Sequence, residues 1–407
     1  MQTDDSEAVL RQPLCHFRNR VFKMKKLLTN VRRWILFYIV WRAVFRLASL
    51  KPIDGKLILF AFSKNYSEMP DNLRGLYKYY NSKGYNCKIM QSPQSSLKRV
   101  LFDIEFQKYY ARCKCVFVTD NFDPLYANKP NRGTRVVQLW HACGAFKKWG
   151  YSTLDLKWGG SREDMLRFPM HNTYTDVFVS SEYIIPCYAE AFGCDKSIIK
   201  ALGTPRTDIY FDRDFVSGSR GTLLESFPEI GNRKIILYAP TFRGNSPEQS
   251  YNEVPLDYAA MKQNFGEEYA LVLKLHPFTA KKYRLSDEEK RLYGDFVFDA
   301  SSLPIETVLC ASDLLIADYS SLIFEYALLN RPMIFFAYDL EEYDRDRSFY
   351  YDYRSFVPGK IAASNDEIIR TIKEKDFREE KIPGFTEKFM SACDGHCTER
   401  IGEYCTK

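Results

Sequence analysis

The sequence lacks the features that identify several large classes of protein. Its apolar run WILFYIVW, at residues 34–41, is far shorter than the roughly 20 residues that a membrane-spanning helix needs. It has no low-complexity tract and no obvious internal repeat, which argues against a disordered or repetitive architecture. The motifs GxxxxGK[ST], GxGxxG, HExxH and GxSxG are also absent. The chemistry of the protein must therefore be sought in less familiar patterns.

Charge and cysteine content narrow the possibilities further. A net charge of +6 over 407 residues does not by itself indicate nucleic acid, and we expect no nucleic-acid partner. Cys113 and Cys115 alternate in a strand-like run, as buried thiols do in a reducing compartment. Cys393, His396 and Cys397 lack a second pair that would complete four metal ligands. We therefore expect neither a metal nor another cofactor.

The N-terminal segment combines basic and aromatic residues. The basic residues are Arg18, Arg20, Lys23, Lys25, Lys26, Arg32 and Arg33. The run at 34–41 follows them, and no small-residue cleavage site of a signal peptide comes after it, so we expect the chain not to be exported. This composition suits a helix lying in an anionic membrane surface, peripherally, on the cytoplasmic face. The alternative is a helix packed against the first lobe.

The rest of the chain alternates between short apolar runs and helical stretches, which indicates mostly parallel sheets. The expected strands lie at 56–63, 87–90, 113–120, 135–141, 175–181 and 197–205, then at 234–242, 269–277, 296–300, 313–321 and 331–339. The length fits two domains. We expect an α/β fold of GT-B type, with two Rossmann-like doubly wound domains facing a cleft. The expected boundaries are 1–54 for the membrane-associating segment, 55–225 for the acceptor domain and 226–407 for the donor domain.

Histidines follow one expected strand in each lobe. His141, in WHACGAFKKWG, precedes Lys147 and Lys148, and His276 ends LKLHP. Ligands bind beyond the carboxyl ends of strands in open α/β sheets, so the two imidazoles should face one another across the cleft. An imidazole can take a proton from a hydroxyl nucleophile, and lysines can hold phosphate. The alternative is a histidine in a core turn beside two solvated lysines. Arg206 in GTPRTD is a weaker candidate of the same kind.

The segment DLLIADYSSLIFEYALLNRP predicts an anion site. Asp318 ends a buried strand, and Ser320 and Ser321 stand where the next helix should begin. Free N–H groups at a helix start, together with two hydroxyls, suit a pyrophosphate. Glu325, about one turn further on, could meet a ribose hydroxyl. The alternative is a capped helix with a solvated glutamate.

Five separated segments resemble the CDP-glycerol glycerophosphotransferase family, the primases and polymerases of teichoic-acid-like polymers. The segments are WHACGAFKKWG, GTPRTD, LYAPTFR, LKLHP and DLLIADYSSLIFEYALLNRPMIFFAYDLEEY, in that order. The match covers roughly residues 56 to 355 and is strongest in the second lobe. A departure lies at Ala142, Cys143 and Gly144, where the family usually has Gly-Thr-Pro. The acceptor-side loop is therefore expected to differ in shape.

The resemblance implies a function and roles for particular residues. It implies in-line attack on the β-phosphorus of a CDP-polyol, release of CMP, and a lipid-linked saccharide acceptor at the inner membrane face. His141 would be the base, and His276 would steady the pyrophosphate. Arg243, Asp318, Ser320 and Ser321 would lie in the nucleotide site. The chain also lacks the long N-terminal extension of the large polymerases, which favours a primase or a short-product transferase.

Glycerol phosphate is the polyol phosphate that we expect to be transferred. Ribitol phosphate from CDP-ribitol is the first alternative. The second alternative is a GT-B glycosyltransferase that uses a nucleotide sugar, since the fold does not fix the group transferred. A third, a membrane-surface protein without activity, should lack the histidines and serines of the family, yet this chain has them.

Overall fold

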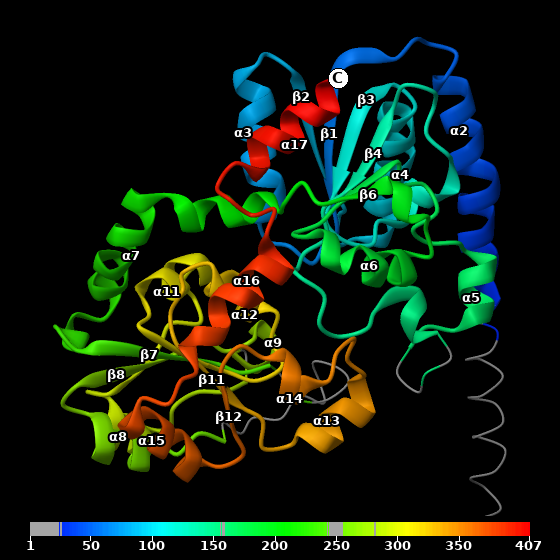
Figure 1. Ribbon diagram of the computed structural model, residues 1–407. Coiled ribbons are helices and arrows are strands. Elements are labelled where there is room, and N and C mark those ends of the chain that lie inside the picture. Colours follow the sequence, from blue (N-terminus) through cyan, green and yellow to red (C-terminus); the bar gives the residue numbers. More distant parts are fainter. Residues whose placement is uncertain are drawn as a thin grey trace, which may run out of the picture.

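The computed structural model describes residues 24, 27–154, 156, 159–241, 243, 255–280 and 282–407. These residues form two lobes, each built around a six-stranded sheet in which every paired strand is parallel (Figure 1). Among them, no helix is both long and apolar enough to cross a bilayer. The two-lobed α/β architecture that the sequence predicts is confirmed.

The sheet of the first lobe has the order β2-β1-β3-β4-β5-β6. Its strands are β1 (Asp54–Phe62), β2 (Asn86–Gln91), β3 (Cys113–Val118), β4 (Arg135–Gln138), β5 (Asp176–Phe178) and β6 (Ile199–Lys200). Alternate side chains of β1 enter different cores, because successive residues of a strand point to opposite faces. Phe60 packs with α3 (Asp71–Ser82), whereas Leu59 packs with α4 (Ser96–Tyr110). Burial on both faces explains the continuous apolar strand.

The sheet of the second lobe has the order β12-β11-β10-β7-β8-β9. Its strands are β7 (Lys234–Ala239), β8 (Tyr269–Leu273), β9 (Val297–Asp299), β10 (Leu314–Ala317), β11 (Met333–Phe336) and β12 (Lys360–Ala362). Counted from β7, this is the 3-2-1-4-5-6 order of a dinucleotide-binding fold. The order reverses between β7 and β10, which places a ligand crevice beyond the carboxyl ends of those two strands.

Helices cover both faces of the second sheet. They are α8 (Tyr258–Phe265), α10 (Asp287–Tyr293), α11 (Ile305–Ala311), α12 (Leu322–Ala327), α13 (Leu340–Arg347) and α15 (Asn365–Glu374). α8 and α15 share a core with Ile236 and Tyr238 of β7, whereas α11 and α12 share the other core with Leu237. The chain crosses from the first lobe to the second through α7 (Arg213–Ser226) (Figure 1).

The C-terminal end of the chain returns to the first lobe. After α16 (Ile382–Met390), helix α17 (Cys397–Thr406) lies beside α3 (Figure 1). Tyr80 donates a hydrogen bond to the carbonyl of Gly402 at 3.0 Å, and Lys114 donates one to the carbonyl of Thr406 at 2.9 Å. The domain division at 225/226 stays a proposal, and α17 would have to be assigned to the first lobe within it.

The N-terminal segment packs one face on the first lobe. A π-helical turn, Leu36–Val40, leads into α2 (Trp41–Ala48), and Phe37, Trp41 and Phe45 recur every four residues on its buried side. The Phe45 ring lies 5.1 Å from the ring of Tyr110, centroid to centroid. For this face of the N-terminal segment, the alternative considered above, a helix packed against the first lobe, therefore holds. The basic residues at 18, 20, 23, 25 and 26 lie outside the described residues.

Several predicted element boundaries differ from the structure, and one strand was missed. The strand expected at 135–141 ends at Gln138, because Trp140 adopts a left-handed backbone with φ 55°. The run LIFEYALLN, at residues 322–330, predicts one continuous helix after Ser321, but α12 ends at Ala327. The short edge strand β12 was not predicted from the sequence, since its three residues form no distinct apolar run.

Candidate active site

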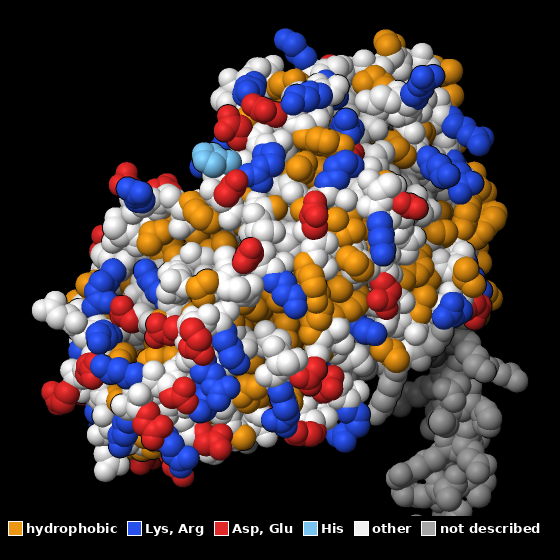
Figure 2. Space-filling view, viewed as in Figure 1, with side chains coloured by type: hydrophobic (Ala, Val, Ile, Leu, Met, Phe, Trp, Pro, Cys, Tyr) orange, Lys and Arg blue, Asp and Glu red, His pale blue; other side chains and the backbone are white. Residues whose placement is uncertain are grey.

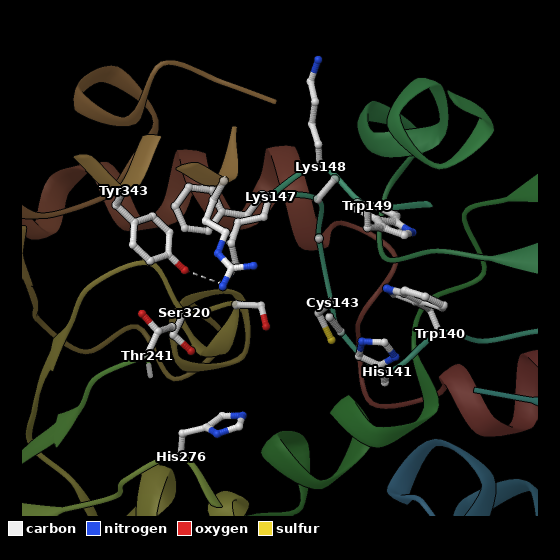
Figure 3. Close-up of a pocket in the computed structure, with 16 residues that line it drawn as sticks. Trp140, His141, Cys143, Lys147, Lys148, Trp149, Thr241, His276, Ser320 and Tyr343 are labelled. Carbon is white, nitrogen blue, oxygen red and sulfur yellow. Dashed lines mark hydrogen bonds between the residues drawn. The ribbon is translucent and has the colours of Figure 1, made fainter. Parts of the chain in front are cut away.

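A cavity of about 440 Å³ lies between the two lobes, and Figure 3 shows its lining. The first lobe contributes residues 140–149, and the second contributes Thr241, His276, Ser320, Ser321, Tyr343 and Arg347. Its described lining includes Lys147, Lys148 and Arg347 but no aspartate or glutamate. We call it the cationic cavity. The charge of its lining suits a phosphate-bearing ligand.

The second lobe supplies its groups from three neighbouring strands. Thr241 follows β7, His276 follows β8, and Ser320 and Ser321 follow β10. Since β10, β7 and β8 are adjacent in the sheet, their carboxyl ends bring these side chains to one edge. The Ser320 hydroxyl accepts a hydrogen bond from the amide of Leu322 at 3.3 Å. Helix α12 has only six residues, so the hydroxyls matter more here than a helix dipole.

The loop after β4 carries His141 into the cavity. Its backbone is held in place because the buried side-chain amide of Asn72 donates to the Trp140 carbonyl at 2.7 Å. The left-handed conformation of Trp140 costs free energy, so such anchoring is needed to maintain it. Gly144 is also left-handed, with φ 63°, and a Cβ there would lie 2.3 Å from the Phe324 ring. The loop therefore fits against the second lobe only with glycine at this position.

The His141 side chain lines the cavity and is exposed to it. Its Nδ1 lies 3.3 Å from the carbonyl oxygen of Thr119, and a proton on Nδ1 would leave Nε2 free to accept one. Desolvation lowers the pKa of His141 to about 4, with a smaller effect in the same direction from Arg206. The imidazole is therefore neutral near pH 7, as a general base must be. Burial, with Lys147 nearby, also lowers the pKa of His276.

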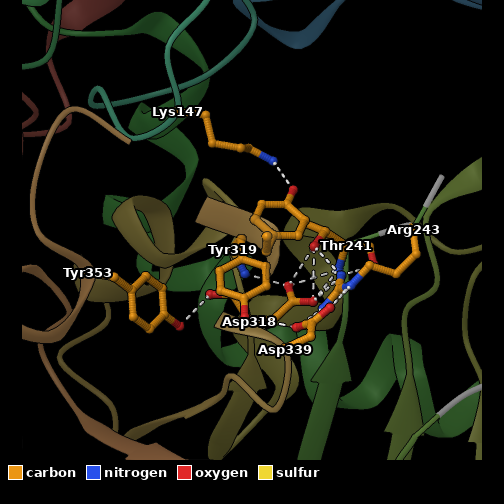
Figure 4. Close-up of polar contacts among 8 residues, drawn as sticks. Lys147, Thr241, Arg243, Asp318, Tyr319, Asp339 and Tyr353 are labelled. Carbon is orange, nitrogen blue, oxygen red and sulfur yellow. Dashed lines mark hydrogen bonds and ion pairs between the residues drawn. The ribbon is translucent and has the colours of Figure 1, made fainter. Parts of the chain in front are cut away.

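Lys147 and Lys148 lie where the lobes are joined by backbone pairing. Lys147 forms an antiparallel bridge with Phe349, and the amide of Lys148 donates to the carbonyl of Ser348 at 3.1 Å. The Lys147 ammonium donates to the hydroxyl of Tyr343 at 3.2 Å. The Lys147 ammonium is thus positioned by a second-lobe hydroxyl (Figure 4), and the Lys148 backbone by a second-lobe carbonyl.

Arg243 and Asp318 form a polar cluster beside the cavity and are absent from its lining (Figure 4). Arg243 lies 2.8 Å from Asp318 and 2.6 Å from Asp339, so two carboxylates already neutralise its charge. Asp318 also accepts hydrogen bonds from the amide and hydroxyl of Thr241, each at 2.9 Å. The cluster fixes Thr241, which does line the cavity. Direct contact of Arg243 or Asp318 with a nucleotide stays a prediction.

Arg206 and Glu325 also lie outside the lining of the cationic cavity. The two side chains form a salt bridge between the lobes, with 2.8 Å from Nε of Arg206 to the Glu325 carboxylate. Arg206 also donates to the carbonyl of His141 at 3.1 Å. Glu325 is only 2% exposed, and its proposed contact with a ribose hydroxyl gains no support from this geometry. Burial raises the pKa of Glu325, while Arg206 acts against that rise.

Six of the ten predicted site residues line the cationic cavity. They are His141, Lys147, Lys148, His276, Ser320 and Ser321. Sequence reasoning missed Tyr343 and Arg347, whose spacing of four on α13 puts them on one helix face. It also missed Thr241, in the APTFR segment, and Trp140, beside His141. Within the described part of the chain, no group of three or more His, Cys, Asp or Glu side chains could hold a metal ion.

Several curated proteins resemble this chain over most of its length. The teichoic acid poly(ribitol-phosphate) polymerase of Bacillus spizizenii is 38% identical over 363 residues, which are 88% of this chain and 57% of that protein. The ribitol-phosphate primase of the same organism is 33% identical over 378 residues, 88% of this chain and 92% of the primase. The glycerol-phosphate primase of Bacillus subtilis is 30% identical over 289 residues, 70% and 72% of the two chains.

The fold also matches solved structures. The wall teichoic acid polymerase TagF, in a variant soaked with CDPG, superposes with a TM-score of 0.74 at 23% identity, covering 95% of this chain and 97% of the other. The model of the family CDP-Glycerol:Poly(glycerophosphate) glycerophosphotransferase matches residues 43–407. Because that match spans both lobes and every part of the cationic cavity, the chain belongs to this glycerophosphotransferase family.

Proposed function

We propose that this chain transfers a polyol phosphate from a CDP-polyol to a hydroxyl of a lipid-linked saccharide, releasing CMP, in the synthesis of a teichoic-acid-like polymer. The observation that carries the proposal is the cationic cavity, where His141 of one lobe and the serine pair of the other line the same space. Membership of the glycerophosphotransferase family supports the proposal independently.

The cavity has the groups that displacement at phosphorus needs. Lys147 and Arg347 offer positive charge to the donor pyrophosphate, and Ser320 and Ser321 offer hydroxyl donors. Lys148 also lines the cavity, but its side chain extends away from Ser320 and His276 in Figure 3. His276 lies on the same wall and would steady the pyrophosphate. His141 takes the proton of the attacking hydroxyl, whose oxygen bonds to the β-phosphorus. The bond from that phosphorus to the bridging oxygen breaks, and CMP leaves with the electron pair.

Glycerol is the polyol that the family resemblance favours, and ribitol is the second candidate. The ribitol-phosphate polymerases and primase that resemble this chain are 33% to 38% identical to it. The glycerol-phosphate enzymes are 27% to 30% identical. Because the ribitol-phosphate enzymes have the higher identities, CDP-ribitol remains a candidate donor beside CDP-glycerol.

The N-terminal segment supports a peripheral position on the cytoplasmic membrane face. Its outward side exposes the apolar residues Leu27, Leu28, Val31, Trp34, Ile35, Ile39, Leu47 and Leu50. In Figure 2, hydrophobic side chains gather along the edge of the first lobe where α2 lies. Arg32 and Arg46 are exposed on the same segment. Apolar side chains beside arginines suit an anionic lipid surface, which also carries the proposed acceptor.

The released nucleotide tests the proposal. We would incubate the protein with a lipid-linked saccharide and CDP-glycerol, CDP-ribitol or UDP-sugars in turn, and separate the nucleotides. The proposal predicts CMP from one or both CDP-polyols, formed only when acceptor is present. Release of UDP from a UDP-sugar, with no CMP from either CDP-polyol, would indicate a glycosyltransferase instead.

A further inference from the structure

A second cavity shares His141 with the cationic cavity. It has a volume of about 510 Å³ and is lined by residues 65–72, Arg74, Thr119, His141, Arg206 and residues 302–306. The first lobe supplies all of these except 302–306, so this cavity too lies at the junction of the lobes. Among the described residues, His141 is common to the linings of both cavities. We call this second space the mixed-charge cavity.

The two cavities differ in charge and therefore favour different ligands. The mixed-charge cavity is lined by three carboxylates, those of Glu68, Asp71 and Glu306. Its two arginines are already paired: Arg74 lies 3.1 Å from Asp71, and Arg206 lies 2.8 Å from a glutamate of the second lobe. Arg74 also lies 3.8 Å from Glu68, so a single arginine charge faces the three carboxylates and the net charge of the lining is negative. This net charge disfavours a phosphate, whereas hydroxyl groups can donate to carboxylates. The lining therefore suits a polyhydroxylated ligand.

Further polar groups extend this preference. Asn65, Ser67 and Ser302 are exposed in the lining and can both donate and accept hydrogen bonds. Burial, with the charge of Asp120, raises the pKa of Tyr66 to about 12. Its phenol is therefore neutral near pH 7 and can bond a hydroxyl, while its ring offers an apolar face to a sugar or polyol carbon chain.

Internal hydrogen bonds hold the walls of the mixed-charge cavity in place. On the second lobe, Lys274 donates to the carbonyls of Ser301 and Leu303, and the amide of Leu275 donates to the Ser301 hydroxyl at 3.0 Å. On the first lobe, Gln91 donates to the carbonyl of Tyr66 at 2.7 Å. The residues beside Ser302 are thereby tied to the segment that carries His276, so both cavities share one framework.

We propose that the mixed-charge cavity binds the polyhydroxylated end of the acceptor, a sugar or polyol that carries the attacking hydroxyl. This proposal rests on the function proposed above. The acceptor reaches His141 from this cavity, and the donor phosphates reach it from the cationic cavity. The hydroxyl proton passes to the imidazole, the hydroxyl oxygen bonds to the β-phosphorus, and CMP departs on the cationic side.

Variants of Ser302, which is exposed, and of Glu306, which is half-buried, test this assignment with little risk to folding. Ser302→Trp would fill the mixed-charge cavity, and Glu306→Gln would remove a carboxylate acceptor. KM would be measured separately for CDP-polyol and for a soluble alkyl disaccharide that replaces the lipid-linked acceptor. We expect Glu306→Gln to raise the acceptor KM by about tenfold, the worth of one hydrogen bond to a charged group, and Ser302→Trp to raise it by at least as much by filling the space. Both variants should leave the donor KM within about twofold.

Ser320→Ala combined with Ser321→Ala is the matched control in the cationic cavity. It should raise the donor KM and leave the acceptor KM unchanged. An unchanged acceptor KM in Ser302→Trp, or a rise in the donor KM instead, would overturn the assignment. If the unmodified protein releases no CMP, the proposed function itself has failed. If it releases CMP and Ser302→Trp behaves like it, only the acceptor cavity is wrong.

Discussion

The guanidinium of Arg206 in the first lobe lies 2.8 Å from the buried carboxylate of Glu325 in the second. The same guanidinium donates to the carbonyl of His141, and the backbone amide of Arg206 donates to the side chain of Asn72 at 3.0 Å. Glu325 lies one turn beyond Ser321, at the edge of the cationic cavity. The salt bridge therefore connects the helix that follows the proposed phosphate-binding serines of the second lobe to the backbone of the proposed base. We propose that Arg206 and Glu325 act as positioning residues.

Breaking this salt bridge should lower both stability and turnover. Glu325→Gln leaves the Arg206 charge without its partner, which typically costs about 3–5 kcal/mol of unfolding free energy. We expect kcat to fall about 100-fold, as misplacement of a reacting group does, with little change in donor KM. Urea unfolding and steady-state kinetics measure the two effects.

A double variant separates positioning from stability. Arg206→Met with Glu325→Leu removes both charges and should recover much of the lost stability. It should not recover kcat, because methionine cannot donate to the His141 carbonyl. Full recovery of kcat in the double variant would mean that the pair is only structural.

His141→Ala should severely lower turnover and leave donor binding intact. The imidazole acts on the acceptor hydroxyl and not on the nucleotide, so we expect kcat to fall by about 10² to 10⁴. Calorimetry should give a dissociation constant for CDP-glycerol or CDP-ribitol within about twofold of the unmodified protein. His396→Ala, at an exposed histidine of the first lobe, is the matched control. A loss of donor affinity as large as the loss of rate would exclude His141 as the base.

The pH dependence of kcat/KM should reflect the lowered pKa of His141. The pKa is about 4 in the free protein, against 6.5 ordinarily, so the imidazole stays neutral and able to accept a proton down to about pH 5. The acid limb should therefore lie near pH 4, with circular dichroism confirming that the protein is still folded. An acid limb near pH 6.5 in the folded protein would show that desolvation in the cleft does not lower the pKa of His141, or that His141 is not the base.

The lowered pKa of His141 also makes the free energy of unfolding depend on pH. The unfolded chain binds a proton at His141 near pH 6.5, whereas the folded protein does so only near pH 4. The contribution of His141 to stability is therefore present above pH 6.5 and is lost as the pH falls towards 4. His171 is buried against Tyr174, and its pKa is also lowered to about 4 by desolvation, so its effect has the same sign.

Much of the fold follows from local sequence patterns, whereas part of the site does not. The buried parallel strands and the glycine-ended helix α3 are visible as apolar runs and turn residues. His141, His276 and the serine pair could be found because each follows a predicted strand. The pairing of Arg206 with Glu325 could not, because it arises only when the lobes dock. The mixed-charge cavity was not predicted for the same reason, since it also forms only where the lobes meet.

We predict that the outward face of the N-terminal helix binds an anionic membrane surface. Trp34→Ser, Ile35→Ser and Ile39→Ser together remove exposed apolar side chains and should reduce sedimentation with anionic liposomes by about tenfold or more. Folding should be unaffected. Leu292→Ser, at an exposed leucine of the second lobe, is the matched control. Unchanged sedimentation of the triple variant would contradict the membrane proposal.

The inner face of the same helix should behave differently. Phe45→Ala removes a buried ring that packs on Tyr110 and should cost about 3–5 kcal/mol of unfolding free energy. Removal of all residues before Lys51 would expose the surface beneath Phe37, Trp41 and Phe45. We therefore expect point variants to test membrane binding more cleanly than truncation.

Mass spectrometry of the acceptor after reaction tests the central claim most directly. The acceptor would be incubated with the protein and CDP-glycerol or CDP-ribitol, with His141→Ala as the parallel sample. We predict that the acceptor gains the mass of one or more glycerol phosphate or ribitol phosphate units with the unmodified protein and gains at most a trace of it with the variant in the same time. An acceptor that gains no polyol phosphate from either donor, or that gains a sugar from a nucleotide sugar instead, would contradict the account.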